Sequence, residues 1–214
     1  MINVYSVCTG SKYPLAYVYA LRDMVQQYLT IPHTFICISD RDIPDIKTIQ
    51  PPVIYQSWWD KINLFNYADG KSLFFDLDVV IVGNINYLVD YAEYELAAPA
   101  NWAQSGHGGI QSSVLAWNGL YKEPCQVFDP DKHIKQFWGD QEFLTYLRGD
   151  AWIKIPGVGS YKYHCRNAIK DDLRVITFHG DPKPHVVNDD HILPYTKALR
   201  GYLCGTGQQT KTNG

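Results

Sequence analysis

Two aspartates, Asp76 and Asp78, interrupt an apolar run and have the spacing that most directly suggests chemistry. The run over residues 73–82 reads Leu-Phe-Phe-Asp-Leu-Asp-Val-Val-Ile-Val, and its β-branched and aromatic content predicts a buried strand. Residues two apart on a strand share a face, so both carboxylates are expected to project together. Because paired buried carboxylates repel each other and lose hydration, they predict a cation beside them. The alternative is a strand end whose acids reach water.

A second group of candidates lies near the N-terminus. Residues 2–7 predict a strand, a polar loop that contains Thr9 follows, and Tyr13 precedes a helix that ends near residue 29. Such a strand, loop and helix N-terminus can cradle an anion or a nucleotide, although an ordinary turn has the same pattern. Asp40 follows a second predicted strand, 34–39, where an acid either binds a base or ribose or is simply hydrated.

The acidic run needs neighbouring elements to position its partners. A short strand is predicted over 53–55 and a helix over 57–68, with Lys61 at the edge of its apolar stripe. The lysine stem is then covered while the ammonium reaches the acidic strand. Later strands are predicted over 95–98, 112–118, 152–155 and 173–178, and a last helix over 194–202.

Two further segments carry polar residues whose role the sequence leaves open. Asp140 begins a predicted helix and is followed by Gln141, so it is either the N-cap or a ligand-binding group. The loop over 99–110 contains Trp102 and His107 and ends in a glycine pair. It is either a lid or acceptor-binding segment or an ordinary loop tip.

Composition bounds the class of protein. With 46% hydrophobic residues in 214, the chain can form one α/β domain over 1–204, and 205–214 has the composition of a flexible tail. A net charge of −3 disfavours nucleic-acid binding. Five scattered cysteines without a close pair indicate no disulfide framework and suggest a cytoplasmic setting. No leader pattern and no apolar run of membrane-spanning length is present, so no integral membrane segment is expected.

Taken in order, these motifs resemble those of the GT-A nucleotide-sugar glycosyltransferases, in particular family 8 of the glycogenin and bacterial galactosyltransferase type. The resemblance extends over most of residues 2–185. It implies a single Rossmann-like GT-A domain with a central mixed sheet flanked by helices. The matching residues are Lys61, Asp76-Leu77-Asp78, Asp140-Gln141, and Gly180, Lys183 and Pro184 in the run 177–185.

The resemblance also implies roles around a nucleotide sugar. Asp76 and Asp78 would hold Mn²⁺ or Mg²⁺, which bridges the donor diphosphate. The family's metal-binding histidine is replaced here by Thr177, and His179 would take its place because a shift of two keeps the face of a strand. The other expected nucleotide contacts are Thr9, Tyr13 on the base, Asp40, Lys61, Gly180 and Lys183 on phosphate. The expected catalytic residues are Lys61, Asp140 on the sugar hydroxyls and Gln141 at the anomeric carbon.

The activity implied is transfer of a hexose from UDP-glucose or UDP-galactose to a hydroxyl of a saccharide or other acceptor, with retained configuration. Gln111-Ser112-Ser113 departs from the family's Asn-Ser-Gly at the donor-sugar strand. The sequence leaves the oligomeric state open.

Two other functions fit part of the pattern. A haloacid-dehalogenase-type Mg²⁺ phosphatase would use Asp76 as nucleophile and Asp78 as general acid, with the pair 171–172 or 189–190 as its later acids. That signature normally lies on a first strand, whereas several elements precede it here. A non-catalytic sugar-binding protein on the same fold would account for the altered segment at 111–113.

Overall fold

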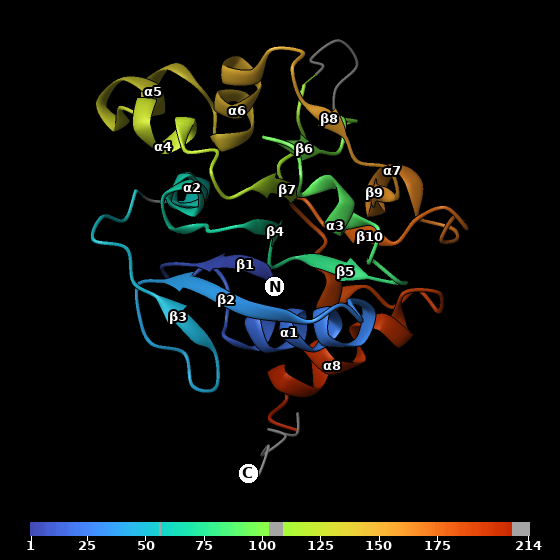
Figure 1. The fold of residues 1–214 in the computed structure, drawn as a ribbon. Helices are drawn as coiled ribbons and strands as arrows, with labels where there is room; N and C mark the ends of the chain where they lie inside the picture. Colours follow the sequence, from blue (N-terminus) through green and yellow to red (C-terminus); the bar gives the residue numbers. More distant parts are fainter. Residues whose placement is uncertain (56, 103–108, 207–214) are drawn as a thin grey trace.

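A seven-stranded mixed sheet forms the centre of the molecule in a computed structural model, which describes residues 1–55, 57–102 and 109–206 (Figure 1). The first four strands of the sheet are parallel, and the fifth runs antiparallel to its neighbours on both sides. In sheet order the strands are β3 (Lys47–Ile49), β2 (His33–Ser39), β1 (Ile2–Cys8), β4 (Lys71–Phe75), β7 (Val114–Asn118), β6 (Ala97–Ala98) and β8 (Ile153–Lys154).

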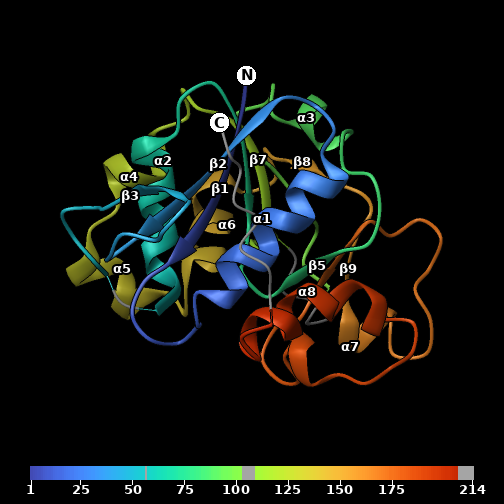
Figure 2. The ribbon, with the colours of Figure 1, turned by 90° about the horizontal axis from the view of Figure 1, so that it is seen from below.

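Helices cover both faces of this sheet, which explains why its inner strands β1, β4 and β7 are buried along most of their length. On β4, Leu73 and Phe75 face the cluster formed with α1 (Ala16–Tyr28), while Phe74 faces the opposite cluster with α2 (Leu64–Tyr67). Figure 2 shows α1 beside the last helix, α8 (Leu193–Leu203). The other face carries the 3₁₀ helix η1 (Ser57–Asn63), α4 (Glu123–Val127), α5 (Pro130–Gln136) and α6 (Asp140–Arg148).

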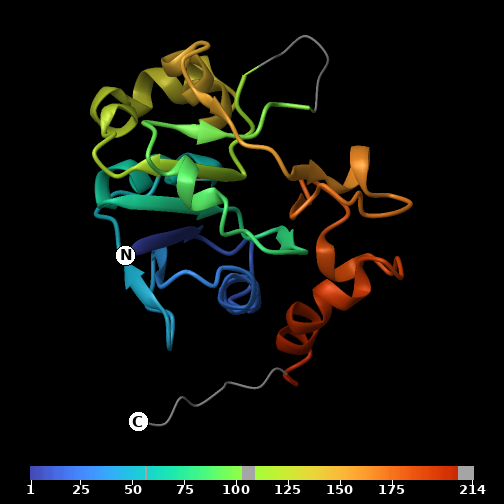
Figure 3. The ribbon, with the colours of Figure 1, turned by 45° about the vertical axis from the view of Figure 1, so that its right-hand side comes forward.

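A small second sheet lies beside the first (Figure 3). Its central strand pairs antiparallel with one neighbour and parallel with the other. The strands, in order, are β5 (Val79–Ile81), β10 (Val175–Thr177) and β9 (Val158–Ser160). Helix α7 (Tyr161–His164) lies against β9, and the 3₁₀ helix η2 (Pro184–Val186) lies against α8, whereas the short helix α3 (Leu88–Tyr91) packs on β4 and β7 of the first sheet.

The predicted strand over 73–82 is wrong in one important respect. It divides into β4 and β5, which belong to different sheets, and Asp76 and Asp78 lie in the turn between them. The amide of Asp76 donates to Ser113 O, and that of Val79 donates back to Asp76 O and closes the turn. The shared strand face therefore does not exist, because the chain changes sheets at the charged residues.

Other expectations differ in smaller ways. No strand forms over 53–55, because Val53 O accepts from the Asn63 side chain and Tyr55 N–H donates to the Asp60 side chain, and β3 is the edge strand of the sheet. Asp140 is the first residue of α6, and Gly139 is its N-cap. Helices α4, α5 and α7 and strand β9 were not predicted. The helices at 16–28, 140–148 and 193–203 and the α/β architecture with a mixed sheet are confirmed.

Two sequence expectations fall partly beyond the part described. His107 and the rest of 103–108, which is half of the loop over 99–110, lie outside the described residues, as do 207–214 of the proposed tail, so the boundary at 204 stays a prediction. All five cysteines are free thiols. Among the described helices, none combines the length and apolarity needed to cross a bilayer.

Candidate active site

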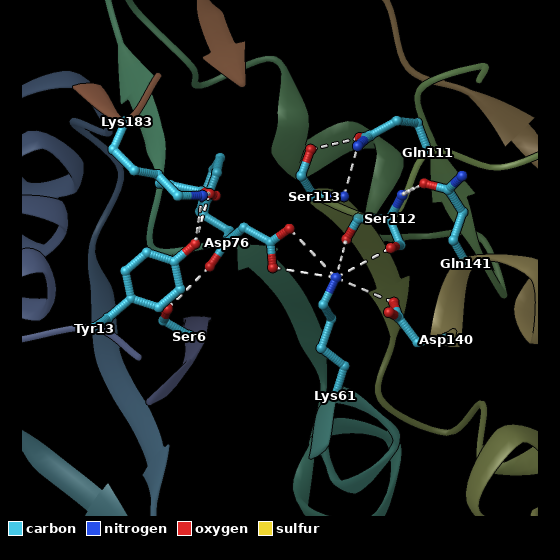
Figure 4. A network of polar contacts seen from close by, with 12 residues as sticks. Ser6, Tyr13, Lys61, Asp76, Gln111, Ser112, Ser113, Asp140, Gln141 and Lys183 are labelled. Carbon is cyan, nitrogen blue, oxygen red and sulfur yellow. Dashed lines mark hydrogen bonds and ion pairs between the residues drawn. The ribbon is translucent and has the colours of Figure 1, made fainter. Parts of the chain in front are cut away.

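A cavity of about 760 Å³ opens beside the carboxyl ends of β1 and β4 and gathers most of the predicted site residues. Its walls come from the loop after β1, the start of η1, the turn at 76–78, the start of α6 and the loop after β10. The site residues that line it are Thr9, Tyr13, Lys61, Asp76, Asp78, Asp140, Gln141, His179, Gly180 and Lys183. Figure 4 shows two centres of polar contact among them, one at Lys61 and one at Lys183.

Lys61 is buried and lies between two carboxylates from distant parts of the chain. Its ammonium is 3.2 and 3.3 Å from the two oxygens of Asp76 and 3.1 Å from Asp140 Oδ2, and it donates to Ser112 Oγ at 3.1 Å (Figure 4). Burial alone would lower the pKa of Lys61, but the charges of Asp140 and Asp76 outweigh it and hold that pKa above its usual value. Lys61 therefore stays cationic and joins the turn at 76–78 to α6.

The surroundings of Asp76 shift the pKa of its carboxyl group upward. Burial raises its pKa above the usual range, and the neighbouring charges of Asp78 and Asp140 act in the same direction, while the Lys61 ammonium opposes them. The carboxylate is thus held ionised mainly by its lysine partner. Removal of that partner would leave a cluster of acids with too little positive charge.

The segment 111–113 forms the floor beside Lys61. The amide oxygen of Gln111 accepts from the backbone N–H of Ser113 at 3.0 Å and from its hydroxyl, so this glutamine is turned onto its own segment. The side-chain oxygen of Gln141 accepts from Ser112 N–H at 3.3 Å. The altered segment therefore binds the start of α6 directly and fixes Gln141 in the cavity wall.

The second centre joins three segments at Asp78. Lys183 Nζ lies 2.5 Å from Asp78 Oδ2, and the same oxygen accepts from Tyr13 Oη at 2.7 Å. Lys183 also donates to Tyr13 Oη at 2.9 Å. Burial first, then the charge of Asp78, raise the pKa of Tyr13, so its hydroxyl stays protonated and donates. Tyr13 packs against Tyr17, which explains its position at the start of α1.

His179 lines the same cavity as the two aspartates of the turn. The backbone N–H of Phe178 donates to Asp78 O at 3.2 Å and so brings the two segments together. His179 Nε2 lies 2.8 Å from Ser160 Oγ, and its ring stacks on Tyr163. Burial, together with the charge of Lys162, lowers the pKa of His179 and favours the neutral imidazole. His179 therefore has a hydrogen-bond partner on the side of β9.

The donor set fits a divalent cation in chemical type. Two carboxylates suit Mg²⁺ or Mn²⁺, which proteins commonly bind through one or two carboxylates together with substrate phosphates, and a neutral imidazole is a ligand form. Within the part of the chain described, no three such side chains are gathered closely enough to hold a metal by themselves.

The loop that follows β1 is fixed by hydrogen bonds to two aspartates, Asp60 and Asp40. Thr9 Oγ1 donates to Asp60 Oδ2, and the other oxygen of the fully buried Asp60 accepts from Tyr55 N–H at 2.6 Å. Asp40 accepts from Gly10 N–H at 2.9 Å and does not line the cavity. Asp40 and Asp60 therefore shape the loop, and Thr9 connects it to η1.

Three residues that support or line the cavity were not predicted from the sequence. Asp60 escaped notice because nothing local marks it as buried, and the only signal was its place one residue before Lys61. Trp58 and Trp138 both line the cavity, and neither was singled out as a site residue. The position of Trp138 two residues before Asp140 was the available signal.

Comparison with known proteins gives matches in structure and none in sequence. No protein family and no curated protein matches the chain by sequence. The galactosyltransferase LgtC, solved with donor and acceptor sugar analogues, superposes with a TM-score of 0.69 at 14% identity over 93% of this chain and 95% of that one. The glycosyltransferase GlyE of Streptococcus pneumoniae TIGR4 gives 0.72 at 14% identity, over 100% and 67%. The bifunctional glycosyltransferase WbbM gives 0.65 at 10%, over 92% and 49%.

Proposed function

This chain has the GT-A fold of known glycosyltransferases, and on that premise we propose that it transfers a hexose from a nucleotide sugar to an acceptor hydroxyl. The observation that carries the proposal is a cavity at the carboxyl ends of the strands in which Lys61 and Lys183 each hold carboxylates. In this proposal the Lys183 ammonium stabilises the diphosphate as it departs, and Lys61 holds the carboxylates at the sugar end of the cavity. The donor we propose is UDP-glucose or UDP-galactose.

In this proposal the donor's nucleotide lies against the first loop and the loop after β10. Tyr13 supports the base, Thr9 and the segment held by Asp40 border the ribose, and Lys183 moves from Asp78 to the β-phosphate. Gly180 has a positive φ of 66°, which lets the backbone turn tightly next to Lys183. These roles use only residues that line the cavity or support its wall.

A divalent cation, Mn²⁺ or Mg²⁺, belongs to the proposal. Asp76, Asp78 and His179 would hold it, and it would neutralise charge on the departing nucleoside diphosphate. His179 would then exchange its present contact with Ser160 or coordinate through its other ring nitrogen. Asp140 and Gln141 would bind the hexose, with Lys61 keeping the Asp140 carboxylate in place.

The chemical step exchanges one bond for another at the anomeric carbon. The bond from the anomeric carbon to the β-phosphate oxygen breaks, the acceptor oxygen bonds to the same carbon, and the acceptor's proton passes to the departing diphosphate. No separate general base is required, which agrees with the retained configuration that we propose.

The test is a titration of the protein with UDP-glucose and UDP-galactose by calorimetry, with Mn²⁺, with Mg²⁺ and with a chelator, alongside an assay of released UDP. We expect metal-dependent UDP release that is lost in Asp78→Ala. The matched control is Asp171→Ala, an exposed acid outside the cavity. Binding of the donor without release of UDP would instead indicate a non-catalytic sugar-binding protein.

The Asp171→Ala variant also distinguishes the transferase proposal from the phosphatase interpretation. That reaction needs a later acidic pair beside Asp76, but neither 171–172 nor 189–190 lines the cavity, and Asp189 accepts from Tyr161 Oη at 2.6 Å. Hydrolysis of simple phosphate esters that is lost in both Asp76→Asn and Asp171→Ala would contradict the transferase proposal.

A further inference from the structure

Two tryptophans at the mouth of the cavity are exposed to an extent unusual for this residue type. Trp138 is 88% exposed and Trp58 is 46% exposed, and both line the cavity. Burying an indole is strongly favourable, and exposed aromatic surface at the rim of a polar cavity indicates a binding surface. Neither residue has a role in the nucleotide and metal contacts proposed above.

The two side chains are held in place by the same elements that position the sugar end of the cavity. In the 3₁₀ helix η1, residues three apart lie one above the other, so Trp58 lies one turn from Lys61 on the same side. The indole N–H of Trp58 donates to Trp138 O at 2.8 Å. A Cβ on Gly139 would be 2.2 Å from Trp58 Nε1, so only glycine at 139 permits this approach.

Position along the chain connects this surface to the reacting end of the donor. Trp138 and Gly139 run directly into Asp140 and Gln141, the residues at the hexose in our proposal. Tyr13 and Lys183, assigned to the nucleotide, meet at Asp78 in the other polar centre of Figure 4. A ligand on the tryptophans would therefore lie next to the transferred sugar.

The charged residues at the rim of the cavity limit the class of ligand that can bind the two tryptophans. Lys12 Nζ lies 5.8 Å from the Trp58 ring centroid and 5.4 Å from that of Tyr13, so a cation already covers part of Trp58. Trp138 is the more open indole of the two. A flat indole next to carboxylates and an ammonium matches a pyranose ring, which presents an apolar C–H face and a rim of hydroxyls.

We propose that Trp138 and Trp58 form the acceptor subsite and stack on a hexopyranose ring of a saccharide acceptor. This inference rests on the proposed transferase function, and it assigns the acceptor class that the function leaves open. The acceptor hydroxyl would enter from the rim toward Asp140 and Gln141.

The test uses protein labelled with 5-fluorotryptophan, titrated with methyl β-galactoside, methyl β-glucoside and N-acetylglucosamine in the presence of UDP and Mn²⁺. The ¹⁹F signals of Trp138 and Trp58 are assigned by their loss in Trp138→Phe and Trp58→Phe. We expect the Trp138 signal to move with at least one saccharide, while that of the fully buried Trp117 stays fixed. A Trp138 signal that no saccharide moves would overturn the inference.

The affinities of two variants for saccharide and for UDP give the second measurement. Trp138→Ala is expected to weaken saccharide binding roughly tenfold, as loss of one aromatic contact does. The matched control is Tyr146→Ala, an exposed aromatic on α6 that does not line the cavity. Loss of UDP affinity in Trp138→Ala would place this indole at the nucleotide and overturn the inference. Absence of UDP binding in the unmodified protein would contradict the transferase function itself, so the two failures are distinguishable.

Discussion

Replacement of Lys61 by methionine is expected to destabilise the fold as well as the site. Methionine keeps the length and the apolar stem of the side chain and removes the ammonium. Asp76 and Asp140 would then face each other without the cation that lies 3.1 to 3.3 Å from both. Asp140 is 3% exposed, so its carboxylate would be poorly hydrated after the lysine is lost.

The expected loss in the free energy of unfolding follows from the burial of the ion pairs of Lys61. Breaking a buried ion pair by removing one partner costs about 3–5 kcal/mol, because a buried charge is left uncompensated. Here one lysine serves two carboxylates, of which Asp140 is buried and the Asp76 side chain is 27% exposed, so a loss within that range is expected. For a protein of about this size, each 1 kcal/mol lowers Tm by roughly 2–4 °C, so the loss should be visible in a thermal scan.

The assay is denaturant unfolding of Lys61→Met, with Lys71→Met as the matched control. Lys71 is 41% exposed and pairs with the exposed Glu93, so its loss should change the free energy of unfolding by less than about 1 kcal/mol. Adding Asp140→Asn to Lys61→Met should recover part of the loss, since one buried charge is removed. Equal effects of the two lysine variants, or simple additivity of Lys61→Met with Asp140→Asn, would refute the reasoning.

Three further outcomes are expected. Lys183→Met should weaken UDP binding, measured by calorimetry, at least tenfold, because a charge-assisted contact to phosphate is worth about 1.5–3 kcal/mol. Lys183→Arg should retain part of this affinity. Equal affinity of wild type and Lys183→Met would exclude the phosphate contact. Thr9→Val should cost about 1–3 kcal/mol in denaturant unfolding, because it leaves buried Asp60 Oδ2 without its donor, and an unchanged midpoint would contradict this. Gly119→Ala should destabilise by about 1–3 kcal/mol or more, because its Cβ would lie 2.6 Å from Gly70 N, and a wild-type Tm would show that the backbone moves aside freely.

The apolar runs of the chain predicted much of the fold correctly. Strands β1 and β2 and helices α1, α6 and α8 appear near their expected positions because each buries a continuous or periodic apolar pattern. Short elements such as α4, α5 and β9 were missed, since they are stabilised by tertiary contacts with few local signals. The clustering of Trp59, Phe128, His133 and Phe143 that supports α5 joins residues far apart in sequence.

The acidic pair shows how residue type can predict a cationic neighbour even where the predicted backbone geometry is wrong. Asp76 and Asp78 were expected to share a strand face, yet they lie in a turn and are held by different lysines. Residue type predicted the need for positive charge, because carboxylates next to an apolar run require it. The identity of the partners depended on contacts between distant segments. Lys183, for example, reaches Asp78 across 105 residues.

The charge of the cavity bears on its need for a cation. Four carboxylates line it, those of Asp76, Asp78, Asp140 and Glu142, against the three lysines at 12, 61 and 183. A diphosphate would enter a space in which negative charge already exceeds positive charge, and Lys183 can reach it only by leaving Asp78. The uncompensated carboxylate that results is unfavourable in a partly buried site unless another cation takes the place of the ammonium. UDP affinity without divalent metal is therefore expected to rise in Asp78→Asn, which removes that charge, while affinity with Mn²⁺ falls. The same sign for both changes in calorimetry would show that Asp78 does not balance charge in this way.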